Sequence, residues 1–88
     1  MKIGDYVKSE INGTVDRGWI IGEADYSEGD VFVIASGLAI GMPVNKRWLT
    51  IDGESSTRKA AMLRGRYLKC HPGRLTDLVQ PGQPEQKP

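Results

Sequence analysis

The amino-acid sequence predicts a mainly β fold: a small β barrel or a strongly curved antiparallel sheet of about five strands, with one short helix or helical turn. Three observations predict it. Segments rich in β-branched and aromatic residues recur about every ten residues. Most of these segments alternate apolar and polar residues, as a strand with one buried face does. The turns between them contain many of the chain's 11 glycines, which is typical of small, tightly curved β folds.

The first two strands are expected to form a hairpin. Residues 3–8, Ile-Gly-Asp-Tyr-Val-Lys, alternate in the manner of a short strand, and Asn12-Gly13 follows them. An Asn-Gly pair is a strong hairpin signal because a type I′ turn needs positive φ at both central positions. The second strand is predicted from Val15 to near Tyr26. One of its faces carries Arg17, Trp19, Ile21 and Glu23, and the other carries Gly18, Ile20, Gly22 and Ala24.

This N-terminal region resembles a known fold. The residues that carry the resemblance are Ile3-Gly4-Asp5-Tyr6-Val7, the hairpin into Gly13-Thr14-Val15 and the long second strand. Together they resemble Src-homology-3-like (SH3-like) barrels of the chromatin-reader and ribosomal-protein kind, over about the first 35 residues. The resemblance implies a small SH3-like barrel. It implies no particular activity, because one fold hosts many functions.

The apolar run 31–44 is expected to organise the rest of the chain. Its first part, Val31–Ala35, is β-branched and uncharged, which predicts a strand buried on both faces. The run has 14 residues, fewer than the roughly 20 of a membrane-spanning helix. Its glycines and Pro43 also break a helix, so no membrane partner is expected.

Leu38, Ile40 and Met42, near the end of this run, have two interpretations. They add to the core, or they form an apolar interface through which the chain assembles as a homo-oligomer. A small domain buries only about 60% of the surface that its unfolded chain exposes. Pairing across a two-fold axis is the commonest way to bury more, so a homo-oligomer is expected.

The C-terminal half gives less consistent signals. Residues 45–51 alternate and predict another strand. Over 54–65, a serine cluster before Lys-Ala-Ala-Met-Leu-Arg and a glycine after it fit an N-capped helix of two turns. The alternative is a loop that leads into a strand over 62–70. We favour a short helix or irregular loop to Leu63, followed by a strand over Arg66–Cys70.

The last residues are predicted to add little to the core. Residues 74–79 are expected to form one helical turn. Residues 80–88 contain three of the chain's five prolines and no apolar residue, which predicts a disordered tail. The predicted organisation is a single small β domain over 1–79 followed by that tail.

Composition and motifs predict no metal, no cofactor and no catalytic residue. Cys70 and His71 are adjacent, so a strand would point them to opposite faces, and no other cysteine or histidine completes a tetrahedral site. Phosphate-loop, dinucleotide and Gly-x-Ser-x-Gly patterns do not occur. An enzyme would need a site shared between the subunits of a homo-oligomer. The lone cysteine excludes an internal disulfide and fits a cytoplasmic protein.

The charge distribution carries the main functional prediction. The net charge is +1, but residues 1–45 hold three basic and seven acidic residues, and residues 46–88 hold nine basic and four acidic. No acidic residue occurs from Ser55 to Thr76. Cations there would neutralise phosphates while aromatic side chains stack on bases, as in proteins that bind single strands. The predicted nucleic-acid-binding residues are Arg58, Lys59, Arg64, Arg66, Lys69, Arg74, Tyr67 and Trp48.

Two alternatives stay open. In the first, these cations offset the acidic N-terminal half or simply form a solvated face, and the chain is a protein-interaction or structural module that acts through homo-oligomer assembly. The second concerns Trp19 and Trp48, which are predicted in the core or at a barrel mouth; if exposed, they favour a groove for a peptide or small ligand. The sequence favours a small binding module for nucleic acid or another polyanion.

Overall fold

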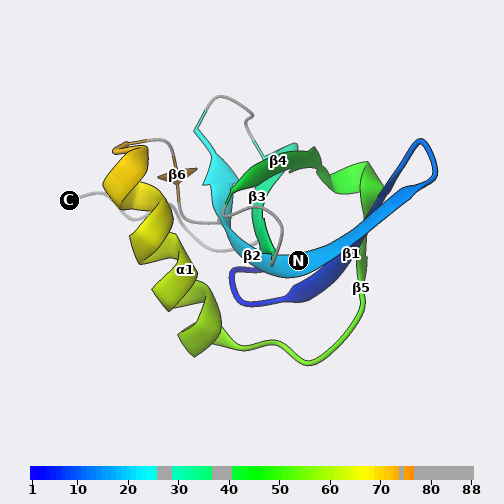
Figure 1. Cartoon of the computed structure of the whole chain (residues 1–88), viewed down its shortest axis with the longest axis horizontal. Helices are drawn as coiled ribbons and strands as arrows, with labels where there is room; N and C mark the ends of the chain where they lie inside the picture. The colour runs from blue at the N-terminus through cyan, green and yellow to red at the C-terminus, as the bar shows by residue number, and fades with distance from the viewer. Residues whose placement is uncertain (26–28, 37–40, 74, 77–88) are drawn as a thin grey trace.

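The structure is a computed structural model, and it describes residues 1–25, 29–36, 41–73 and 75–76. Five antiparallel strands form one curved sheet in the order β4-β3-β2-β1-β5, and a sixth, the short β6, pairs with β2 outside this order (Figure 1). The predicted mainly β fold class is confirmed as the strongly curved sheet, which does not close into a barrel because β4 and β5 lie at the two ends of the order. The elements are β1 (Tyr6–Ile11), β2 (Thr14–Ala24), β3 (Val31–Ser36), β4 (Met42–Asn45), the 3₁₀ helix η1 (Lys46–Trp48), β5 (Leu49–Ile51), α1 (Thr57–Cys70) and β6 (Leu75–Thr76).

β1 and β2 form the predicted hairpin. Asn12 has a φ of 50° and Gly13 a φ of 79°, as the two central positions of a type I′ turn require. Ile11 pairs with Thr14 across this turn, and the same register places Tyr6 opposite Trp19. The hairpin therefore brings two large aromatic side chains together at the end of β1 that lies farthest from the turn.

A β-bulge interrupts the pairing of β2 with β3. Ile20 pairs with Ile34 and Gly22 pairs with Val33, so Ile21 is an extra residue on β2. A bulged residue is left out of the ladder and increases the local twist of its strand. The backbone groups of Ile21 therefore need hydrogen-bond partners from elsewhere in the molecule.

The two faces of the curved sheet carry separate apolar clusters. Successive residues of a strand point to opposite faces, so β3 contributes to both. Phe32 and Ile34 belong to the inner cluster and Val33 and Ala35 to the outer one, and all four are buried, as predicted for this strand. The inner cluster consists of Val7, Ile20, Phe32, Ile34, Val44 and Leu49, and the outer cluster of Ile21, Ala24, Val33, Ala35, Ala60 and Leu75.

α1 packs outside the curl of the sheet (Figure 1), and its first turn is fixed to the N-terminal segment. The Oγ of Ser56 caps the helix by accepting the N–H of Lys59 at 3.1 Å. The N–H of Ser56 donates to the carbonyl of Gly4 at 2.7 Å, and the N–H of Gly4 donates to the carbonyl of Ile20 at 2.9 Å. Gly4 has a φ of 100°, and a Cβ there would lie 3.1 Å from the backbone of Thr57. Glycine at position 4 therefore permits this close contact.

α1 is longer than the sequence predicts, and the predicted strand over Arg66–Cys70 is wrong. The helix runs through Gly65, which is exposed and has no atom within 4 Å of an added Cβ. Beyond it, Tyr67 and Leu68 pack on the outer cluster at helical spacing from Ala60. Their burial outweighs the cost of about 1 kcal/mol for a glycine inside a helix.

The predicted strand over residues 45–51 is also corrected. The side chain of Asn45 accepts the N–H of Arg47 at 3.0 Å and caps η1, so the chain turns after β4. Asn45 is the last residue of β4, and Leu49–Ile51 is a separate strand, β5, that pairs with β1 at the edge of the sheet. A side chain that competes for backbone hydrogen bonds here overrides the alternating pattern.

The end of the described chain differs from the predicted helical turn over residues 74–79. Leu75–Thr76 forms the short strand β6, which pairs with Glu23–Ala24 of β2. Leu75 is buried in the outer cluster, and this burial accounts for the pairing. The predicted tail over residues 80–88 lies outside the described residues.

Candidate functional site

Four cationic side chains lie on the exposed part of α1: Arg58, Lys59, Arg66 and Lys69. At 3.6 residues per turn these positions fall in one arc of the helix, centred on Met62, which is 46% exposed. We call the four cations the basic helix face. The opposite arc carries Ala60 and the other residues that pack on the outer cluster, so Arg58 and Lys69 point away from the sheet, and Lys59 and Arg66 lie at the edge of the basic helix face.

Nothing in the described part of the chain neutralises the basic helix face. None of its four side chains forms an ion pair or a hydrogen bond with another described residue. α1 contains no acidic residue, and Arg58 and Lys59 lie in its first turn. Cations at a helix N-terminus oppose the helix dipole, at roughly 0.3–1 kcal/mol each. The helix dipole therefore does not account for Arg58 and Lys59, whereas an anionic ligand would; Lys69, in the last turn, is favourably placed.

Arg64 lies on α1 but has a different role. Its Nη1 donates a hydrogen bond of 2.7 Å to the carbonyl oxygen of Ile21. Ile21 is the bulged residue of β2, so its carbonyl lies outside the β2–β3 ladder. Arg64 supplies the hydrogen-bond donor for this backbone acceptor. Of the predicted nucleic-acid-binding residues, Arg64 is the one whose guanidinium holds α1 against the sheet.

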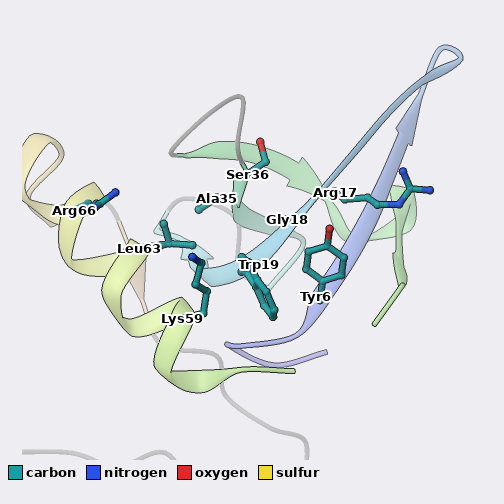
Figure 2. Close-up of a pocket in the computed structure, with 9 residues that line it drawn as sticks. All are labelled: Tyr6, Arg17, Gly18, Trp19, Ala35, Ser36, Lys59, Leu63 and Arg66. Atoms are coloured by element: carbon teal, nitrogen blue, oxygen red, sulfur yellow. The ribbon is translucent and has the colours of Figure 1, made fainter. Parts of the chain in front are cut away.

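A pocket of about 380 Å³ opens between α1 and the sheet (Figure 2). This volume lies within the range of about 300–1,000 Å³ that is typical of small-ligand sites. Lys59, Leu63 and Arg66 line it from α1, and Figure 2 shows them along one side of the opening. We call it the α1–β2 pocket. Two cations of the basic helix face thus also belong to the wall of a cavity.

The sheet side of the α1–β2 pocket is aromatic above a small apolar floor. Tyr6 and Trp19 have ring centroids 4.7 Å apart and ring planes inclined by 59°. Inclined rings do not cover each other's faces as parallel stacked rings would, and both side chains are half-buried. Gly18 and Ala35 are buried beneath them. The pocket therefore offers an aromatic surface beside positive charge.

A third cation, Arg17, lines the same pocket and is partly neutralised. Its Nε donates to Oδ2 of Asp52 at 2.7 Å, and the two side chains are 50% and 34% exposed. Asp52 and Glu54 line a neighbouring hollow that shares Tyr6 and Trp19 with the pocket. The aromatic pair therefore borders a cationic pocket and an acidic hollow.

The other predicted nucleic-acid-binding residues lie elsewhere. Tyr67 packs on the outer cluster and stacks on His71, with ring centroids 4.5 Å apart and planes at 17°. Trp48 is 46% exposed on η1, where the guanidinium carbon of Arg47 lies 5.9 Å from the ring centroid. Trp48 is not among the residues that line the α1–β2 pocket. Arg74 lies outside the described residues.

Sequence reasoning misses Tyr6 and Arg17 as pocket residues, and it offers Trp19 only as the alternative of a groove formed by an exposed tryptophan. The signal that identifies them is the hairpin register. The Asn12-Gly13 turn pairs Ile11 with Thr14, and counting outward from that pair places Tyr6 opposite Trp19. The alternation of β2 already places Arg17 and Trp19 on one face.

The predicted subunit interface is described only in part. Met42, on β4, is half-buried and packs against the inner cluster. Leu38 and Ile40 lie outside the described residues. Assembly into a homo-oligomer through these three residues therefore stays a prediction.

Neither the grouping of metal-ligating side chains nor similarity to known proteins assigns a role to the described residues. Among the described residues, no three His, Cys, Asp or Glu side chains gather in a group that could hold a metal ion. No helix in the described ranges is both long and apolar enough to cross a membrane. Comparison of the chain with protein-family models, with curated proteins and with solved structures finds no match.

Proposed function

We propose that this chain is a small binding module for nucleic acid or another polyanion, and that the basic helix face is its contact surface. The observation that carries the proposal is a set of four exposed cations on one helix that have no anionic partner among the described residues. Phosphate groups would supply those partners and would release condensed counterions on binding.

The proposed contact surface is a local concentration of positive charge. The whole chain has a net charge of only +1, so attraction of a polyanion must come from this surface and not from the total charge. Lys59 and Arg66 are seven residues apart on α1, so their Cα atoms are separated by about 10 Å along the helix axis. That separation is close to the Debye length of about 8–10 Å at moderate salt. Neighbouring cations therefore act together on a polyanion at low salt and are screened from one another at high salt.

The salt dependence of binding tests the proposal. Fluorescence anisotropy of a labelled single-stranded oligonucleotide, a duplex and heparin would be measured from about 50 mM to about 300 mM salt. Each phosphate contact on a single strand contributes about 0.7 to the slope of log K against log salt, so four contacts predict a slope of about −2.8. The double variant Arg66→Gln/Lys69→Gln is expected to reduce this slope to about −1.4.

A matched double variant controls for net charge. Lys46→Gln/Arg47→Gln removes the same number of cations from η1, and we expect it to leave the slope near that of the unchanged protein. If no polyanion binds at about 50 mM salt, the proposed function is wrong. If the two double variants lose the same slope, binding follows the total charge and the basic helix face is not the contact surface.

Replacing Asp52 by asparagine is expected to strengthen binding of the single strand by about two- to fivefold. The change releases Arg17 from an exposed ion pair and removes a negative charge beside the pocket. Anisotropy at low salt measures the gain. Glu54→Gln is the control, since Glu54 lines the acidic hollow but forms no ion pair with a described residue. Equal gains in both variants would show that release of Arg17 contributes nothing.

A further inference from the structure

We infer that the α1–β2 pocket receives an unpaired nucleobase, so that the ligand of the basic helix face is a single-stranded nucleic acid. The inference rests on the proposed function and deepens it by naming the class of polyanion. The observation behind it is that Lys59 and Arg66 belong both to the basic helix face and to the wall of an aromatic pocket.

The chemistry of the pocket fits a base better than it fits charge alone. Its cations suit phosphate, while Tyr6 and Trp19 above the apolar floor suit a flat heterocycle. A sulfated polysaccharide carries negative charge but no aromatic group to stack on these rings. A duplex keeps its bases stacked on one another, and it would have to expel one before that base reached the pocket.

The geometry also fits a strand that runs along α1. Lys59 and Arg66 are separated by about 10 Å of helix, which lets them contact different phosphates on either side of a base held between them. Leu63 lies between these two cations and supplies apolar contact on the helix side, facing the aromatic wall in Figure 2. A base would therefore have protein on both sides and its phosphates at the rim.

The acidic hollow next to the pocket restricts where the strand can run. Asp52 and Glu54 line a hollow that shares Tyr6 and Trp19 with the pocket, and their carboxylates repel phosphate. The backbone of the strand is thus directed along α1, and only a base reaches the aromatic pair. This arrangement assigns the stacking role to Trp19 and Tyr6, on β2 and β1, and leaves Trp48 outside the site.

Intrinsic fluorescence tests the inference because the chain has two tryptophans, only one of which lines the pocket. The Trp48→Phe variant retains Trp19 as its reporter, and Trp19→Phe retains Trp48. Each would be titrated with oligodeoxythymidylate of about 12 nucleotides, within the site sizes of about 4–16 nucleotides that small barrels cover. We expect quenching in Trp48→Phe and none in Trp19→Phe.

Affinity gives the second readout. Trp19→Ala is expected to weaken single-strand binding by about fivefold to a hundredfold, and to leave heparin and duplex binding within about twofold. Trp48→Ala is the matched control and should change none of the three. Trp19 is half-buried, so circular dichroism must first show that Trp19→Ala is folded. An abasic oligonucleotide of equal length makes the same test without a variant. It should bind the unchanged protein about as weakly as the normal strand binds Trp19→Ala.

The outcomes separate this inference from the proposed function. If the abasic strand, heparin and the normal strand bind equally well and Trp19 is not quenched, the pocket receives no base and the proposed function still stands. If none of the ligands binds at low salt, both are wrong. Quenching confined to Trp19, together with weak binding of the abasic strand, supports both.

Discussion

Replacement of Arg64 by methionine is expected to lower the free energy of unfolding by about 1–3 kcal/mol. Methionine retains a long apolar side chain but removes the guanidinium whose Nη1 donates to the Ile21 carbonyl at 2.7 Å. Ile21 is buried, and its carbonyl lies at the bulge, so the acceptor would lose a partner that the sheet does not replace. Urea is the suitable denaturant because it is uncharged and leaves ion pairs unscreened. The midpoint and slope of the urea transition measure the loss.

Arg66→Met is the matched control two residues along the same helix. Arg66 is exposed and has no partner among the described residues, so its replacement should change stability by no more than about 0.5 kcal/mol. The effects on binding should be reversed: Arg66→Met reduces the salt slope by about 0.7, and Arg64→Met leaves it unchanged. If Arg64→Met instead keeps full stability and reduces the salt slope, Arg64 contacts the polyanion and does not hold α1 in place.

Replacement of Gly18 by alanine is the second change with a large expected effect, a loss of about 1–3 kcal/mol of unfolding free energy. A Cβ at position 18 would come within 2.9 Å of the carbonyl carbon of Ala35, and closer still to the carbonyl oxygen and to the Ile34 side chain. The backbone of β3 cannot move aside without disturbing its pairing with β2. This crowding exceeds the gain of about 0.5–1 kcal/mol that alanine usually brings over glycine.

Gly65→Ala should change the free energy of unfolding in the opposite direction. Position 65 is inside α1, is exposed and has no atom within 4 Å of an added Cβ, so alanine gains helix propensity without a clash. We expect an increase of about 0.5–1 kcal/mol in the free energy of unfolding. Thermal and urea unfolding of both variants would be compared. A Gly18→Ala protein as stable as Gly65→Ala would show that β2 and β3 do not approach as closely as the structure describes.

Local signals in the sequence were sufficient for the hairpin and for the central strand. Asn12-Gly13 requires a particular backbone conformation, and Val31–Ala35 is too apolar to have an exposed face. The end of α1 was not predictable in this way. Gly65 is a local stop signal, but burial of Tyr67 and Leu68 against the sheet overrides it. That burial depends on which face of the sheet the helix covers, which no local pattern reveals.

The sequence predicted which kinds of residue form the candidate site, but it predicted only some of the residues that lie there. A run of residues without acidic side chains identified the cations of α1, because a charge pattern can be read without knowing the fold. Their aromatic neighbours could not be read in the same way. Trp19 is 40 residues from Lys59, and the two line one pocket only because α1 crosses the outer face of β2. The sequence instead predicted Tyr67 and Trp48 as the stacking residues, because they are close to the cations along the chain.

Two of the contacts that hold α1 against the sheet bear on the dynamics of binding. One end of the α1–β2 pocket is fixed by the hydrogen bonds from Ser56 to Gly4 and from Gly4 to Ile20, and the other end by Arg64 on Ile21. Both contacts end on the backbone of β2, so we expect the walls of the pocket to move as one unit. A cavity fixed in this way would be preorganised, and a ligand would then have little protein conformational entropy to remove. Most of the ordering that accompanies binding is therefore expected in the ligand.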